Sequence, residues 1–234
     1  MEQQFLRTEM LLGEGAIQRL QQCHVAVFGL GGVGSFAAEA LCRAGVGELT
    51  LIDSDVITVS NINRQLYALH STVGKSKAEL AVSRCRDINP NALLHGITGT
   101  YSAPERDRFW SDYDYVADAI DLVSCKLDLI EQAIIRRIPV ISALGTGNKL
   151  RADLLCITDI SKTSGDALAR VMRKELRNRG IQHTKVVYSP EEASPALPLE
   201  APPPGRRSVP ASVSWVPSVA GLLMAGEIIK DLLK

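Results

Sequence analysis

The stretch Val27–Gly45, VFGLGGVGSFAAEALCRAG, constrains the fold more than any other part of the chain. Gly29, Gly31 and Gly34 have the GxGxxG spacing, and they stand between a strand-like apolar run and a helical pattern. A glycine turn in that setting directs backbone amides toward ligand phosphates, and the helix dipole favours negative charge there. The motif predicts a nucleotide site, either for a redox dinucleotide or for ATP. A turn that only packs a helix on a strand is the alternative.

Apolar runs alternate with helical patterns as far as residue 160, which favours an α/β fold: a Rossmann-like, mostly parallel sheet with helices on both faces. The expected strands are His24–Phe28, Leu49–Ile52, Leu93–Ile97, Tyr115–Ala119, Val140–Ala143 and Leu154–Thr158. The expected helices are Gly34–Ala44, Lys75–Ile88, Pro104–Trp110 and Ser124–Arg137.

The pattern changes after residue 160. Asp166–Arg179 predicts a basic amphipathic helix, Lys185–Tyr188 a short strand, and residues 189–212 a proline-rich flexible loop. A closing apolar helix follows, with Ser218 as its expected N-cap. We therefore expect a nucleotide-binding domain at residues 1–160 and a carboxy-terminal extension at residues 161–234, whose closing helix packs on the main domain.

Bulk properties exclude several classes of protein. Lysine and arginine balance aspartate and glutamate, so no global field indicates nucleic acid or membrane. The amino terminus lacks the apolar core of a signal peptide, and the late apolar stretch Val219–Leu233 carries three charges. The five cysteines form no CxxC pair, so we expect buried small hydrophobic residues and no cysteine–metal site. A cytoplasmic protein without a membrane partner follows.

The segment after the second expected strand favours ATP. DSDVITVSNINRQLYALHSTVGKSKAE contains acids, asparagines, an arginine and lysines within one connection. A magnesium-bound triphosphate needs such cations and an acid for the metal, whereas a dinucleotide does not. Arg64 and Lys77 are the natural phosphate partners, Asp53 stands where a ribose-binding acid is expected, and Asp121 follows a strand end. Taken singly, Arg64 could form a surface ion pair, Lys77 could be a solvated lysine, and Asp121 could cap the next helix.

Four segments carry a resemblance to a known family: GLGGVGS, LIDSDVITVSNINRQ, VGKSKAE and DAID. Together they resemble the adenylating domain of the ubiquitin-activating type, the HesA/MoeB/ThiF superfamily, over residues of about 13 to 160. The resemblance implies binding of ATP and Mg²⁺ and attack of a carboxylate on the α-phosphate. It assigns Gly29, Gly31, Gly32 and Gly34 to the phosphate turn, Asp53 to the ribose, Asn61, Arg64 and Lys77 to the phosphates, and Asp121 to magnesium and the chemistry, with Asp55 and Gln65 in support.

Two absences narrow the choice within this superfamily. Sulfur-carrier-activating relatives usually have two CxxC pairs for zinc, so no zinc is expected here, and thioester-forming relatives need a cysteine that this chain lacks after Cys156. Other segments, among them FLRTEMLLGEGAIQRL, GNKL and KVVYSPEE, resemble the bacterial tRNA threonylcarbamoyladenosine dehydratases nearly from end to end. This resemblance implies adenylation of the threonyl carboxylate in tRNA, then ring closure by a urea nitrogen with net loss of water.

Cations gather after residue 160 and predict a tRNA-binding face. The candidates are Arg170, Arg173, Lys174, Arg177, Arg179 and Lys185, with Arg206 and Arg207 in the proline-rich loop. A solvated helix surface is the alternative. The resemblance also implies a homodimer in which Arg7 reaches the ATP site of the partner, although Arg7 fits an ordinary surface position equally well.

Three other functions stay open at this point. One is an adenylyltransferase that activates the carboxy-terminal carboxylate of a ubiquitin-like sulfur carrier, and another is a non-catalytic nucleotide-binding subunit. An NAD-linked oxidoreductase is disfavoured by the cationic segment. The sequence does not reveal the ring formed, the tRNA species preferred, or whether a sulfur-relay or carrier protein is a partner.

Overall fold

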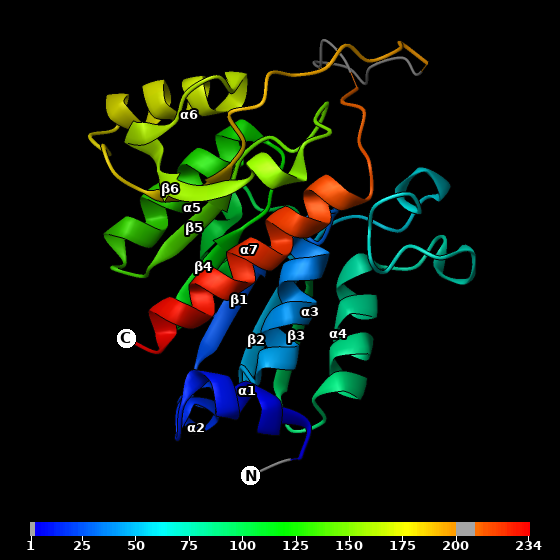
Figure 1. The fold of residues 1–234 in the computed structure, drawn as a ribbon, viewed down its shortest axis with the longest axis vertical. Coiled ribbons are helices and arrows are strands. Elements are labelled where there is room, and N and C mark those ends of the chain that lie inside the picture. Colours follow the sequence, from blue (N-terminus) through cyan, green and yellow to red (C-terminus); the bar gives the residue numbers. More distant parts are fainter. Residues whose placement is uncertain (1–2, 200–208) are drawn as a thin grey trace.

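The computed structural model describes residues 3–199 and 209–234, and within them seven strands form one sheet in the order β3-β2-β1-β4-β5-β7-β6 (Figure 1). The strands are β1 (His24–Phe28), β2 (Glu48–Asp53), β3 (Leu93–Thr98), β4 (Tyr115–Asp118), β5 (Val140–Ala143), β6 (Cys156–Asp159) and β7 (Lys185–Tyr188). Neighbouring strands are parallel except β6, which pairs antiparallel with β7 at one edge. This is a Rossmann-like arrangement, as the alternating pattern predicts.

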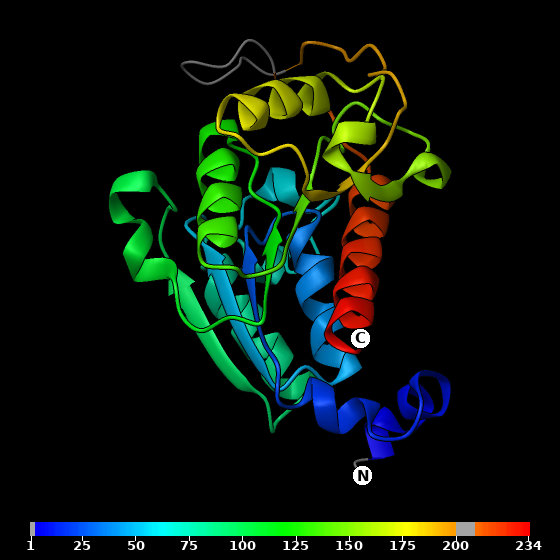
Figure 2. The same ribbon diagram turned by 90° about the vertical axis from the view of Figure 1, so that its left-hand side faces the viewer.

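Helices cover both faces of the sheet (Figures 1 and 2). The α-helices are α1 (Leu6–Leu12), α2 (Ala16–Leu20), α3 (Gly34–Ala44), α4 (Lys77–Ile88), α5 (Val123–Ile135), α6 (Ala167–Asn178) and α7 (Trp215–Leu232). The 3₁₀ helices are η1 (Gln3–Phe5), η2 (Val59–Asn61), η3 (His70–Thr72), η4 (Ala103–Phe109), η5 (Ala152–Leu154) and η6 (Ile160–Lys162). One layer holds α3, α4 and α7, and the opposite layer holds α5 and α6.

Strand β1 shows why the chain has two cores. Its side chains alternate between the two faces of the sheet, as the period of a strand requires. Val25 and Val27 belong to the core under α3 and α7, whereas Ala26 and Phe28 belong to the core on the α5 side. All four are completely buried, so β1 reads as an uninterrupted apolar run.

The carboxy-terminal extension completes the sheet. Strand β7 lies between β5 and β6, so a strand from after residue 160 separates two strands from before it. The closing helix α7 packs along α3, the helix of the first βα unit, in the same layer (Figure 1). The extension is therefore integral to the fold.

Two local expectations are wrong. The closing helix begins at Trp215, before the expected cap Ser218, whose hydroxyl donates to the Ser214 carbonyl oxygen instead. Pro217 is tolerated there because the first turn of a helix needs no amide donor. The stretch predicted as the helix Pro104–Trp110 is the 3₁₀ helix η4, and its proline comes near the start.

The cysteines are less uniform than expected. Cys42, Cys85 and Cys125 are buried, but Cys23 is half-buried and Cys156 is exposed. Cys156 begins β6, the edge strand, and that position leaves one side of the strand uncovered. Within the described residues, the structure has no helix long and apolar enough to span a bilayer.

Candidate active site

The glycine turn between β1 and α3 depends on two close backbone approaches. Gly29 has φ +87°, and a Cβ there would lie 2.6 Å from the carbonyl oxygen of Ala119. A Cβ on Gly34 would lie 1.7 Å from the Gly29 carbonyl oxygen. Only glycine fits at either position, and the tight turn brings the amino terminus of α3 to the carboxyl ends of β1 and β4.

A cavity of about 800 Å³ opens in front of this turn. It lies at the crevice between β1 and β4, where the strand order reverses and where open α/β sheets bind their ligands. Ten of the residues expected at the nucleotide line it: Gly29, Gly31, Gly32, Asp53, Asp55, Asn61, Arg64, Gln65, Lys77 and Asp121. Gly34 acts behind the lining, through the turn that it permits.

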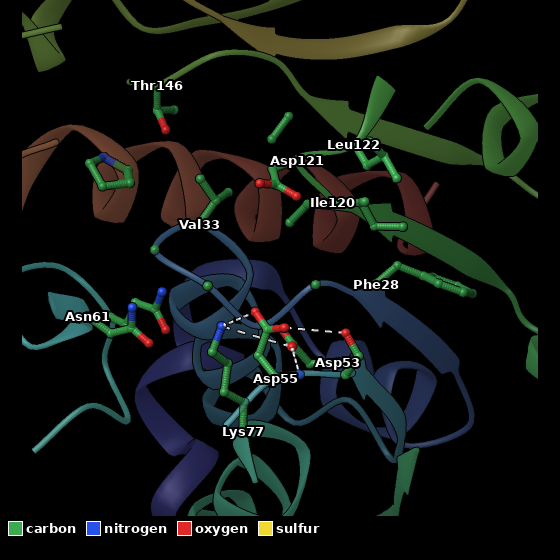
Figure 3. A pocket seen from close by; sticks show the side chains of 18 of the residues that line it. Phe28, Val33, Asp53, Asp55, Asn61, Lys77, Ile120, Asp121, Leu122 and Thr146 are labelled. Atoms are coloured by element: carbon green, nitrogen blue, oxygen red, sulfur yellow. Dashed lines mark hydrogen bonds and ion pairs between the residues drawn. The ribbon is translucent and has the colours of Figure 1, made fainter. Parts of the chain in front are cut away.

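Two acids hold Lys77 at the floor of the cavity (Figure 3). The Lys77 ammonium is 2.8 Å from the Asp55 carboxylate and 3.9 Å from that of Asp53, and only 4% of Lys77 is exposed. Asp53 also accepts hydrogen bonds from the Leu30 and Asp55 amides, at 2.6 and 2.8 Å. Burial raises the pKa of Asp53, and Lys77 opposes that rise. Asp53 thus connects the glycine turn, through the Leu30 amide, to the Lys77 ammonium.

Arg64 stands at the end of the cavity near η2. Its guanidinium donates to the Ser60 carbonyl oxygen at 3.0 Å and to the Asn63 side chain at 2.9 Å, and burial lowers its pKa. The Gln65 side-chain oxygen is buried and has no hydrogen-bond partner among the described residues. Because an unpaired buried acceptor is costly, this oxygen is prepared for a donor or a cation that enters the cavity.

Asp121 lies across the cavity from Asp53, Asp55 and Lys77 (Figure 3). Its side chain is exposed to the cavity, in the turn between β4 and α5. The residue before it, Ile120, is held on both sides: its amide donates to the Asp118 carboxylate at 3.1 Å, and its carbonyl accepts from Lys126 at 2.9 Å. This anchors the backbone that carries Asp121.

This anchor is a buried ion pair that the sequence expectations did not include. Asp118 and Lys126 have no exposed side-chain surface, their charged atoms are 2.9 Å apart, and the Ser142 hydroxyl donates to Asp118 at 2.6 Å. A signal was present, because Lys126 occupies a helix position between Cys125 and Leu127, both of which are buried.

The far wall of the cavity also went unpredicted. It consists of Leu144, Gly145, Thr146 and Gly147 after β5, together with Val209, Pro210, Ser212 and Pro217. Asn148, at φ +57°, holds these two parts of the wall together. Its amide donates to Ala211, its side-chain oxygen accepts from the Ala211 amide, and its carbonyl accepts from the Ser194 amide, each at 2.7 Å. One residue thus ties both ends of the proline-rich segment to the cavity rim.

The basic residues divide into two groups. Arg170, Lys174 and Arg177 share the exposed face of α6, and Arg179 is exposed at its end, where it pairs with Glu131 at 2.8 Å. Arg173 is half-buried and donates to Thr163, and Lys185 is ion-paired with Glu227 and Asp231. Arg206 and Arg207 lie outside the described residues. Arg7 is exposed on α1 and is not among the residues that line the cavity.

Comparisons with known proteins agree with this geometry. Residues 5–234 match the model of the ThiF family. The tRNA threonylcarbamoyladenosine dehydratase of Bacillus subtilis is 42% identical over an alignment of 244 residues, which covers 99% of this chain and 95% of that protein. The structure of the E. coli tRNA N6-threonylcarbamoyladenosine dehydratase in complex with ATP has a TM-score of 0.88 at 33% identity, covering 98% of this chain and 93% of that one.

The same E. coli enzyme in complex with AMP gives a TM-score of 0.87 at 33% identity, again over 98% of this chain and 94% of that one. Both the family match and the structural similarity extend beyond residue 160 into the extension that completes the sheet. On these grounds, the chain belongs to the ThiF family.

Proposed function

We propose that this protein is an ATP-dependent tRNA threonylcarbamoyladenosine dehydratase. The observation that carries the proposal is the cavity at the α3 amino terminus, which Arg64, Lys77 and Asp121 line together around space for a triphosphate. Full-length similarity to dehydratases, one of them described with ATP, supports the tRNA substrate. A cytoplasmic location belongs to the same proposal.

In the first step, a threonyl carboxylate oxygen attacks the α-phosphorus of ATP, and the bond to pyrophosphate breaks. Negative charge grows on the phosphoryl oxygens and on the departing pyrophosphate. Arg64 and Lys77 stabilise that charge, with Asn61 and the amides of the glycine turn as further donors. Lys77 exchanges its contact with Asp55 for a phosphate, and Asp53 holds the ribose.

A magnesium ion fits the residues at Asp121. Mg²⁺ prefers oxygen ligands and binds through one or two carboxylates together with substrate phosphates. Asp121 offers a carboxylate at the cavity, and the buried, unpaired oxygen of Gln65 adds a second oxygen in the same cavity. When bound, the ion supplies charge neutralisation to the phosphates. The anchored Ile120 backbone keeps the Asp121 carboxylate in place for it.

In the second step, a urea nitrogen attacks the activated acyl carbon, the ring closes, and AMP leaves as the nitrogen loses its proton. Nucleophile and electrophile belong to one modified nucleoside, so proximity alone makes this step favourable. No enzyme thiol takes part in this route. Wall residues after β5 enclose the acyl end of the cavity and limit hydrolysis of the mixed anhydride.

We place the tRNA backbone on the exposed face of α6. Leu168, in the first turn of this helix, lines the cavity, so a phosphate chain along α6 leads directly to the reacting nucleoside. The contributing cations are Arg170, Lys174 and Arg177, and Arg179 joins them by exchanging its exposed pair with Glu131 for a phosphate. Arg173 and Lys185 are already engaged by protein groups and serve the fold instead.

A homodimer completes the proposal. Helix α1 exposes Met10 and Leu11, whose exposed fractions are 78% and 86%, next to Arg7. Such an apolar surface beside a cation suits a second copy, which would carry Arg7 toward a neighbouring cavity. Light scattering of the purified protein checks this, and replacing Met10 and Leu11 together by aspartate should give a monomer.

One assay tests the activity. The protein is incubated with ATP, Mg²⁺ and total tRNA from cells that contain threonylcarbamoyladenosine, and digested nucleosides are analysed by mass spectrometry. A loss of one water from that nucleoside, dependent on ATP, is expected. An unchanged nucleoside, together with ATP consumption that needs a small β-grasp protein, would instead support the activation of a sulfur carrier.

A further inference from the structure

A second cluster of reactive side chains lies at the opposite end of the sheet from the nucleotide cavity. His24 begins β1, Glu48 begins β2 and His95 lies in β3. In the sheet register His24 is paired with Glu48, and His95 is paired with Thr50, two residues further along β2. Because alternate residues share a face, these side chains emerge on the same side of three adjacent strands.

The three groups converge. The His95 Nε2 atom is 2.8 Å from a Glu48 carboxylate oxygen, and the His24 Nδ1 atom is 3.5 Å from the same oxygen. One ligand atom from each residue lies within 4.8 Å of the others. Nitrogen and oxygen ligands of one zinc ion lie about 3.4 Å apart, so a small rotation of the half-exposed His95 on the edge strand brings them into range.

Hydrogen bonds behind His24 determine which nitrogen faces the cluster. The Tyr113 hydroxyl donates to the Phe109 carbonyl at 2.8 Å. The His24 Nε2 atom lies 2.8 Å from the Thr50 hydroxyl oxygen. This contact leaves Nδ1 as the ring nitrogen nearest to the Glu48 carboxylate.

A ring nitrogen and a carboxylate oxygen that face each other can hold one cation between them. Burial lowers the pKa of His24, and nearby Glu48 and Asp114 oppose that effect. Asp114 also accepts from the His24 amide at 2.7 Å, and it fixes the start of β1. The arrangement matches metal-bound histidines, whose second ring nitrogen donates to an outer hydrogen-bond acceptor.

We propose that His24, Glu48 and His95 form a binding site for a zinc-class divalent cation, with the fourth position open to water. Two imidazoles and a carboxylate suit zinc and cobalt rather than magnesium. The ligands come from three strands that are far apart in sequence, so the ion fastens β1, β2 and β3 together at their amino ends. This site is independent of the proposed dehydratase activity.

Isothermal titration of the full, metal-free protein with Zn²⁺ tests the site. One ion per chain is expected, and His95→Ala or Glu48→Gln should weaken binding by about 100-fold. Thr50→Val, which removes only the acceptor behind His24, should weaken it by about tenfold. The matched control is His183→Ala, because His183 is an exposed histidine that pairs, within the described part of the chain, with the single carboxylate of Asp159. Asp121→Asn should bind Zn²⁺ as the wild type does.

Cobalt distinguishes the ligands. Co²⁺ bound here should give visible d–d bands without a thiolate charge-transfer band, and the bands should disappear in His95→Ala. Zinc should also raise the melting temperature of the wild type but not of His95→Ala, which should melt like the wild type without metal. The proposal fails if the wild type binds no zinc, if His95→Ala and His183→Ala bind it equally, or if a thiolate band appears.

Discussion

The Lys126 ammonium lies 2.9 Å from the Asp118 carboxylate, and both side chains are completely buried beneath the turn that carries Asp121. A charge taken out of water remains stable only with a partner and further hydrogen bonds. Ser142, the Ile120 amide and the Ile120 carbonyl provide those bonds. The pair therefore fixes the backbone turn that carries the Asp121 carboxylate.

Breaking this ion pair should lower the free energy of unfolding. Lys126→Met leaves a buried carboxylate without its partner, and we expect a loss of about 3–5 kcal/mol in the free energy of unfolding, measured in urea. The double variant Lys126→Met/Asp118→Asn removes both charges and should recover most of that loss. A single variant as stable as the wild type would mean that the pair does not hold the turn.

Asp121→Ala should abolish ATP–pyrophosphate exchange and leave folding intact. The loss should be on the order of 100-fold or more, equivalent to roughly 3 kcal/mol of transition-state stabilisation. Asp121 is exposed, so circular dichroism and the melting temperature should not change. The control is Asp87→Ala, which removes an exposed acid of α4 outside the cavity. Exchange that persists in Asp121→Ala rejects the assigned role.

Two glycine-to-alanine variants should have opposite effects. At Gly34 the new Cβ would lie 1.7 Å from a carbonyl oxygen, so we expect a loss of about 3 kcal/mol and weaker ATP binding. At Gly226, inside α7, nothing lies within 4 Å, so alanine should stabilise the protein by about 1 kcal/mol. Thermal unfolding measures both. Equal effects would contradict the close approach at the turn.

Stability should depend on Asp231 above about pH 4. Hydrogen bonds from Lys185, Lys234 and Tyr115 hold the pKa of Asp231 at about 2, against the opposing effect of burial. A folded pKa below the unfolded value means stabilisation that is complete above the unfolded pKa and is lost as pH falls through the folded one. Asp231→Asn should therefore cost about 1–2 kcal/mol at pH 7, and the difference should shrink between about pH 4 and 2.

The control for that pH series is Asp153→Asn, which breaks a fully exposed pair with Arg151 and should leave unfolding unchanged. Urea titrations of the three proteins at several pH values measure the effect. A gap between wild type and Asp231→Asn that stays constant down to pH 2 would show that titration of this carboxylate is not its source.

Binding of tRNA should weaken with salt in proportion to the cations on α6. Replacing Lys174 or Arg177 by alanine removes one phosphate contact each, so the slope of log affinity against log salt should fall by about 0.7–0.9. The control is Arg86→Ala, an exposed arginine of α4 in the layer opposite α6. Slopes that change equally in all variants would point to a general charge effect.

Local patterns were enough to predict most of the fold. The bounds of β1, α3, β5 and β7 agree with the sequence expectation because apolar period, glycines and length act together there. Ser218 was expected as the cap because serine is typical of that position, but the helix already begins at Trp215. The antiparallel edge strand β6 depends on pairing with β7, which no local pattern encodes.

Some of the site residues could likewise be predicted from the sequence, and others could not. Those of the glycine turn and the acidic–basic segment could be expected together because they cluster in sequence, and the structure places them around one cavity. The Asp118–Lys126 pair, the Asn148 contacts and the His24–Glu48–His95 cluster were not, because each arises from strand register or from a turn that brings distant segments together. Such contacts become visible only in three dimensions.

The hydrogen bonds of Asn148 have a consequence for how this architecture can vary. Since Ser194 and Ala211 both form hydrogen bonds with that one residue, the two ends of the segment between them are held together. Lengthening such a loop costs little, because closure entropy grows only with the logarithm of its length. Changes in chain length between Ser194 and Val209 can therefore be tolerated while the cavity wall, which includes Val209 and Pro210, keeps its form.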